Sequence, residues 1–196
     1  MSLQHAILGF LNYGPSTGYD LKKVFDRSVN HFWPADQSQI YRTLSQLAEA
    51  SLAEVEIVHQ NDVPDRKVYH ITEAGREKLM EWLTNDIPAT KIRSRELIQV
   101  FFAGQLNEEQ ALGLFQRGLS KSRERLATFY LLQEKSLREH PRSQATGQQA
   151  RDVFFWQLTL ENGIVTTEAL VRWIESVIER LAKQDYTAFP ANTDNS

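Results

Sequence analysis

The chain has 196 residues, of which 41% are hydrophobic and 24% are charged, and its 22 Lys and Arg against 25 Asp and Glu give a formal net charge of -3. This is the composition of an ordinary globular protein of one or two domains, which excludes collagen-like and wholly disordered chains. The absence of Cys excludes disulfides, zinc–thiolate sites, iron–sulfur clusters and cysteine nucleophiles. The apolar run at residues 6–11 is too short for a signal core or a membrane span of ~20 residues, so we expect a cytoplasmic protein.

The first part of the chain has the hydrophobic patterns of three short helices. Apolar residues recur at helical spacing over residues 3–11, 21–29 and 36–50, and the helix breakers Gly14 and Pro15 end the first run. Before the second run, a Thr and an Asp three residues apart have the spacing of a helix N-terminal capping pair.

A β-hairpin is predicted directly after the third helix. Apolar residues alternate with mostly charged ones over residues 53–58, a second β-rich run covers residues 67–71, and the turn-forming residues 61–65 lie between them. Thr72 is a predicted N-cap for a fourth helix. Three helices followed by a hairpin is the order of a winged helix-turn-helix, whose third helix enters the DNA major groove.

The second part of the chain is predicted to be helical after a linker. Residues 85–93 lack periodicity and contain Pro88, which predicts the linker. Helices are expected over residues 94–103, 107–139 and 149–181, and Asn107 with Gln110 three residues on has the spacing of a capping box. The fold class is therefore mainly α, with an N-terminal winged helix and an all-helical C-terminal domain. The expected bounds are a winged helix over residues 1–84, the linker over 85–93, a helical dimerisation domain over 94–186 and a polar tail over 187–196.

The C-terminal helices also predict the oligomeric state. Apolar residues occupy more than one face of the last helix, which indicates burial on several sides. The two long helices offer more apolar surface than about 90 residues can bury alone. We therefore expect a homodimer held by the C-terminal helices.

Four segments of the first part are similar to a known family, as are three features of the second part, at residues 96–97, 101–104 and 160–173. The segments are LGFL at residues 8–11, GPSTGYDL at 14–21, IYRTL at 40–44 and RKVYHITEAGR at 66–76. Together they resemble the PadR-like family of bacterial transcriptional regulators, and the second part is similar to the helical C-terminal domain of its larger members, which are related to virulence activators. The resemblance implies a dimeric regulator, usually a repressor, whose DNA affinity responds in some members to a small aromatic effector such as a phenolic acid.

The third helix supplies the candidate base-reading residues. If Ile40, Leu44 and Leu47 face the core, the outward and flanking residues are polar. Arg can pair with guanine and Gln with adenine through two hydrogen bonds each, and Ser and Tyr hydroxyls reach phosphates or base edges. The alternative is a polar face that only meets solvent. The predicted DNA-binding residues of this helix are Ser38, Gln39, Tyr41, Arg42 and Ser45.

Four further basic residues are predicted to meet the DNA backbone. Arg66 and Lys67 follow the hairpin turn, and Lys22 and Lys23 lie on the second helix. Each can equally be a surface charge without a ligand. Neither half of the chain is basic overall, which counts against general attraction to phosphate, so binding to double-stranded operator DNA depends on this local patch.

Four aromatic residues of the last helix are candidates for an effector site: Phe154, Phe155, Trp156 and Trp173. The alternative is a packed dimer core, which is the more frequent role of large aromatic residues at helical spacing. The effector hypothesis depends mainly on the family resemblance.

No residue is predicted to be catalytic, to ligate a metal or to hold a cofactor. The chain has no nucleophile elbow, phosphate-binding loop, zinc-protease helix or dinucleotide-binding glycine pattern, and its five His residues have no metal-ligand spacing. We predict a sequence-specific transcriptional regulator, with no membrane partner. The alternatives are a winged-helix module that binds protein instead of DNA, against which Arg42, Arg66 and Lys67 count, and a small helical enzyme.

Overall fold

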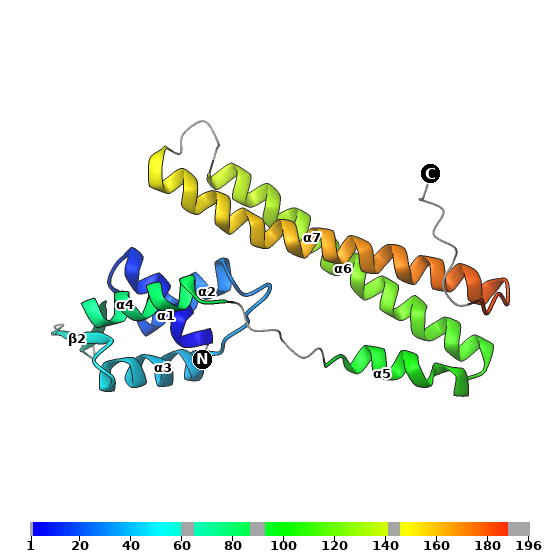
Figure 1. Cartoon of the computed structure of the whole chain (residues 1–196), viewed down its shortest axis with the longest axis horizontal. Coiled ribbons are helices and arrows are strands. Elements are labelled where there is room, and N and C mark those ends of the chain that lie inside the picture. The colour runs from blue at the N-terminus through cyan, green and yellow to red at the C-terminus, as the bar shows by residue number, and fades with distance from the viewer. Residues whose placement is uncertain (1, 60–64, 87–92, 141–145, 188–196) are drawn as a thin grey trace. The chain divides into compact units, whose positions relative to one another are not determined.

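A computed structural model describes residues 2–59, 65–86, 93–140 and 146–187 (Figure 1). The chain divides into two compact units, Met1–Thr90 and Lys91–Ser196. Most of the predicted hairpin turn and of the predicted linker, and the predicted tail after Thr187, lie outside the described residues.

The N-terminal unit has the predicted order of helices and strands. The elements are α1 (Ser2–Tyr13), β1 (Ser16–Thr17), α2 (Gly18–Arg27), α3 (Gln37–Glu49), β2 (Ala53–Val58), β3 (Arg66–Ile71) and α4 (Glu73–Thr84). The strands form an antiparallel sheet in the order β1-β3-β2. The register from Ala53↔Ile71 to Val58↔Arg66 confirms the predicted hairpin. The two-residue strand β1 was not predicted, because two residues are too short to show an alternating pattern.

The core of this unit is built around the apolar faces of the first three helices, and β2, β3 and α4 add Ala53, Tyr69, Ile71 and Leu79. Eight of its side chains are fully buried: Ile7, Leu8, Leu11, Leu21, Phe25, Ile40, Leu44 and Leu47. The side chain of Thr17 accepts a hydrogen bond from the backbone N–H of Asp20 at 3.1 Å, and Thr72 accepts one from Gly75 at 3.0 Å. Both predicted N-caps are therefore confirmed, and they set where α2 and α4 begin.

The C-terminal unit is all helical, as predicted. It comprises α5 (Arg95–Phe102), the short 3-10 turn η1 (Ala103–Gln105), α6 (Glu108–Glu139) and α7 (Gly147–Ala182). The capping box predicted at Asn107 and Gln110 is present at the start of α6. The long helices α6 and α7 pack along one another as an antiparallel pair (Figure 1). No helix in the described ranges is both long and apolar enough to cross a membrane.

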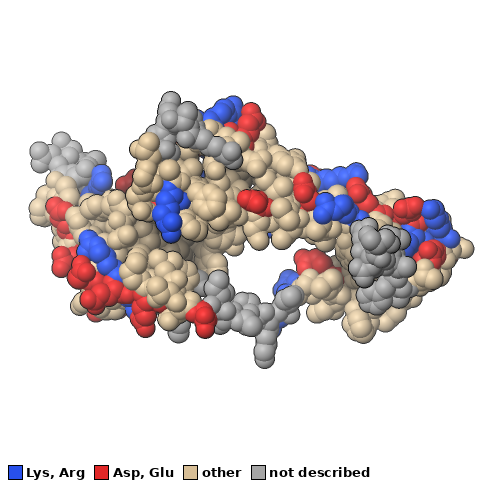
Figure 2. Space-filling view, turned by 45° about the horizontal axis from the view of Figure 1, so that its top comes forward, with Lys and Arg blue, Asp and Glu red and all other residues tan. Residues whose placement is uncertain are grey.

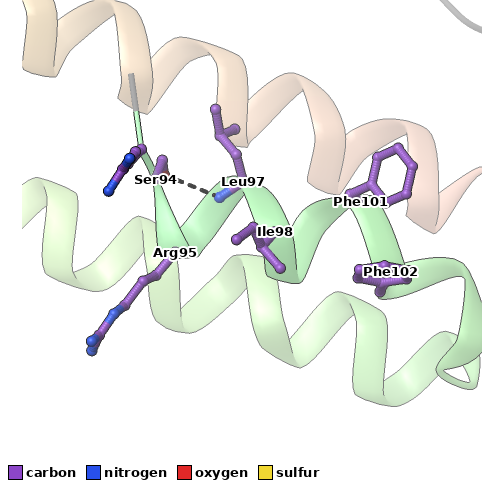
Figure 3. Close-up of a pocket in the computed structure, with 7 residues that line it drawn as sticks. Ser94, Arg95, Leu97, Ile98, Phe101 and Phe102 are labelled. Atoms are coloured by element: carbon purple, nitrogen blue, oxygen red, sulfur yellow. Dashed lines mark hydrogen bonds between the residues drawn. The ribbon is translucent and has the colours of Figure 1, made fainter. Parts of the chain in front are cut away.

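The C-terminal unit leaves much of its apolar surface exposed. Helix α5 buries none of its residues, and Phe101 is 80% exposed. Four large side chains of α5 border an open hollow of about 580 Å³ beside the Ser94 cap, as Figure 3 shows: Leu97, Ile98, Phe101 and Phe102. A monomer rarely exposes an apolar patch of this kind without a partner for it.

Candidate nucleic-acid interface

Helix α3 presents one buried and one exposed face. Ile40, Leu44 and Leu47 have no exposed surface. The five side chains singled out as DNA contacts are all exposed: Ser38, Gln39, Tyr41, Arg42 and Ser45. Because the apolar face anchors the helix to the core, the polar face is held rigidly toward solvent.

Two of these five residues also cap α3. The Asp36 carboxylate accepts hydrogen bonds from the Ser38 hydroxyl at 2.7 Å and from the backbone N–H of Gln39 at 2.8 Å, while Gln39 Oε1 accepts from the Asp36 N–H at 3.1 Å. The hydrogen bond from Ser38, followed by that from Gln39, lowers the pKa of Asp36. The sequence analysis missed this capping box, although an Asp three residues before a Gln is its signal.

Arg42 lies one turn further along the exposed face. Within the described ranges its side chain forms no ion pair and no hydrogen bond with another residue. An exposed guanidinium without an ion pair or a side-chain hydrogen bond among the described residues is available for a ligand. Of the predicted base-reading residues, Arg42 therefore fits the bidentate pairing with guanine best.

The wing and α3 meet at an open hollow of about 490 Å³. Its lining comes from the start of α2, from α3 and from the start of β3: Thr17, Gly18, Tyr19, Asp20, Tyr41, Asp65, Arg66 and Lys67. The structure thus brings Arg66 and Lys67 beside Tyr41. The Tyr41 ring packs on Gly18 so closely that a Cβ there would lie 2.7 Å from Tyr41 Cε1, which explains the glycine at this position.

Three of the four predicted backbone-contacting residues have partners inside the protein. Lys22 pairs with Asp26, the Lys23 ammonium lies 4.2 Å from the centre of the Tyr19 ring, and Arg66 lies 3.8 Å from Asp20. Lys67 has no ion-pair partner in the described part of the chain. Acidic side chains gather over part of the N-terminal unit, at the lower left of Figure 2. Since these side chains repel phosphate, attraction of DNA depends on the few local cations.

The four predicted effector residues do not form one cluster within a single chain. Trp156 and Trp173 lie 17 positions apart on α7, which is about 26 Å along the axis at ~1.5 Å per residue. The rings of Phe154 and Phe155 meet edge to face with centroids 5.4 Å apart, and Trp173 meets Phe115 at 6.1 Å. All four are between 39% and 55% exposed, so they are not a packed core in the isolated chain.

The described residues offer no metal site. No three His, Asp or Glu side chains in these ranges gather closely enough to hold an ion. The exposed polar face of the third helix, the adjacent wing with Arg66 and Lys67, and the antiparallel helical pair are instead the features of a two-domain winged-helix DNA-binding protein.

Comparison with known protein families shows which winged-helix family the chain resembles. The model of the transcriptional regulator PadR-like family matches residues 7–81, and the virulence activator alpha C-terminal model matches residues 92–182. The chain thus carries a PadR-like domain followed by a virulence activator alpha C-terminal domain, which confirms the resemblance and the fold class. It is accordingly a DNA-binding transcriptional regulator.

Characterised relatives cover almost the whole chain. The negative transcriptional regulator PadR of Bacillus subtilis is 27% identical over 183 residues, which are 92% of this chain and 98% of that protein. The crystal structure of that PadR in complex with operator DNA has a TM-score of 0.79 and 26% identity, over 92% of this chain and 99% of the other. The Vibrio cholerae virulence activator AphA has a TM-score of 0.71 and 26% identity, over 93% and 99%.

Proposed function

We propose that this chain is a cytoplasmic repressor that binds operator DNA as a homodimer, with α3 of each subunit in the major groove and the wing on the adjacent backbone. The observation that carries the proposal is the exposed polar face of α3, where the unpaired Arg42 lies on a helix that also borders the hollow containing Arg66 and Lys67. Repression is supported by the similarity to the negative regulator PadR. The proposal assigns no catalytic, metal or cofactor role to any residue.

Salt dependence of binding to duplex DNA tests this function. We expect binding to a random duplex to weaken as salt rises, with a slope of about 0.9 per phosphate contact, and an operator selected from a random pool to bind more tightly at every salt concentration. A winged-helix module that binds protein would show neither effect. Failure of the wild-type chain to bind any duplex at low salt would sink the proposal.

The expected homodimer is supported by the exposed apolar side chains of α5. Leu97 and Phe101 are 54% and 80% exposed, and no residue of α5 is buried, so this helix offers an apolar face that a second molecule can cover. Light scattering on the full chain is expected to give twice the mass of 22.6 kDa at micromolar concentration. Replacing both Leu97 and Phe101 with serine should shift that mass toward the monomer, whereas a wild-type monomer would contradict the proposal.

A small aromatic effector is the proposed signal, because the PadR of B. subtilis has also been solved in complex with p-coumaric acid, in a structure with a TM-score of 0.76 and 25% identity to this chain. A planar aromatic acid is expected to weaken operator binding about 5- to 150-fold, the usual range of coupling between two sites. It should also change tryptophan fluorescence.

The distance between Trp156 and Trp173 allows the effector site to be located. We expect the fluorescence response to vanish in Trp156→Phe or in Trp173→Phe, because one small ligand cannot contact both side chains of one subunit. A response lost in both variants would place the ligand between Trp156 of one subunit and Trp173 of the other. Trp82→Phe, in the N-terminal unit, is the matched control and should keep the response. If operator affinity and fluorescence ignore a broad panel of aromatic acids, the effector proposal is wrong and the aromatic side chains serve the dimer core.

A further inference from the structure

The ion pair between Asp20 and Arg66 differs from the other charge contacts of the interface. Lys22 and Asp26 lie one turn apart on α2, and Lys23 and Tyr19 are likewise neighbours on that helix. Asp20 and Arg66 instead join the first turn of α2 to the first residue of the wing strand β3, and both line the hollow beside Tyr41. This pair therefore sets where a wing cation lies in the free protein.

The carboxylate is the fixed partner of this pair. Its Oδ2 atom accepts a hydrogen bond from the Thr17 hydroxyl at 2.7 Å, and Thr17 is itself only 7% exposed and is paired with Val68 in the sheet. The N-terminal turn of α2 stabilises a negative charge at this position. Asp20 is thus held by the cap, the sheet and the helix dipole together.

The guanidinium is the movable partner. Arg66 Nη2 lies 3.8 Å from the same Oδ2 atom, and its side chain is 53% exposed on a long, flexible stem. A phosphate that approaches the wing must draw Arg66 away from Asp20 and also meets the carboxylates of Asp20 and Asp65 in the hollow. In the free state the Asp20–Arg66 pair is neutral, so it adds little to the attraction of DNA.

We propose that Asp20 is a positioning residue that withholds Arg66 from the DNA backbone and so lowers the affinity of the wing for any duplex. This inference rests on the proposed DNA-binding function. With Arg66 paired to Asp20, Arg42 and Lys67 are the interface cations that meet DNA first, in a chain whose net charge is -3.

Asp20→Asn tests the inference, because asparagine keeps an oxygen for the Thr17 hydroxyl but loses the charge. We expect affinity for random and selected duplexes to rise by the same factor, about two- to fivefold for each bound subunit, which is the strength of an exposed ion pair. The salt slope should steepen by about one unit as Arg66 gains a phosphate. Asp20→Glu, which keeps the charge, should bind as the wild type does.

Asp65→Asn is the matched control. Asp65 lines the same hollow but pairs with His59 at 2.9 Å, so this variant removes an equal charge from the same place without releasing Arg66. Its effect on affinity and slope should be smaller than that of Asp20→Asn. In an Arg66→Ala background, Asp20→Asn should gain no more than Asp65→Asn does.

The outcomes separate this inference from the proposed function. Circular dichroism checks that each variant is folded, and Asp20→Ser, which also offers Thr17 an oxygen, replaces Asp20→Asn if that variant does not fold. The inference is overturned, while the function stands, if the wild type binds DNA and Asp20→Asn or Asp20→Ser binds no more tightly than Asp65→Asn. The same conclusion follows if these Asp20 variants bind more weakly than the wild type. If the wild type binds no duplex, the proposed function itself fails.

Discussion

Replacing Gly75 with alanine is expected to destabilise the N-terminal unit by about 1–3 kcal/mol, the usual range for overpacking a tight site. A Cβ at this position would overlap the Leu52 carbonyl oxygen and lie 2.8 Å from Ile71 Cγ1. Leu52 cannot easily move, because its carbonyl accepts a hydrogen bond from the Thr72 N–H at 3.2 Å. Each kcal/mol corresponds to roughly 4–8 °C in melting temperature for a domain of this size.

Gly9→Ala is the matched control for this variant. Gly9 also lies within a helix, α1, but a Cβ there would meet nothing within 4 Å. Alanine in an open helical position favours the helix by about 0.5–1 kcal/mol over glycine, so this variant should melt at or above the wild-type temperature. Thermal unfolding followed by circular dichroism checks both variants. Equal melting temperatures for Gly75→Ala and Gly9→Ala would show that α4 can move away from Leu52.

The helices and their N-caps could be predicted because their signals are local. Thr17, Thr72 and Asn107 each stand directly before a periodic apolar run, and the structure confirms all three as caps. The exposed face of α3 also followed from spacing alone, once Ile40 and Leu44 were taken as core. Local periodicity therefore accounts for the fold class and for which face of α3 is exposed.

Contacts between distant parts of the chain could not be predicted in this way. Strand β1 exists only because Ser16 and Thr17 pair with Tyr69 and Val68, some 50 positions later. The ion pair between Asp20 and Arg66 depends on the same pairing, since it brings the start of α2 to the wing. No spacing rule in the sequence reports a contact of this kind.

The aromatic residues of α7 show a different limit of sequence reasoning. Residue type alone grouped Trp156 with Trp173, whereas the rise of the helix separates them by about 26 Å in one chain. Composition identified which side chains suit an aromatic ligand, but only geometry shows which of them one ligand can reach.

Replacing Arg42 with alanine is expected to cost roughly 1–3 kcal/mol per half-site on the selected operator and much less on a random duplex, because Arg42 is exposed on the face of α3 that we propose to meet base edges. Lys67→Ala should instead lower affinity without lowering sequence specificity. Lys67 lies on the wing, where we propose that it meets the DNA backbone, so its loss should weaken both duplexes about equally and make the salt slope shallower by about one unit per lost phosphate contact.

Arg76→Ala is the matched control for the loss of a guanidinium. Arg76 is exposed on α4 and pairs with Glu73 at 3.3 Å, away from the face of α3 and from the hollow beside the wing. Its replacement should change neither the affinity for operator nor the salt slope beyond the small effect of one distant charge.

The most direct test of base reading by α3 is the ratio of operator affinity to random-duplex affinity, measured by titration of the wild type, Arg42→Ala and Lys67→Ala at several salt concentrations. We expect this ratio to fall sharply for Arg42→Ala and to stay at the wild-type value for Lys67→Ala. If Arg42→Ala lowers the affinity for both duplexes by the same factor, Arg42 does not read bases and α3 does not lie in the major groove as proposed.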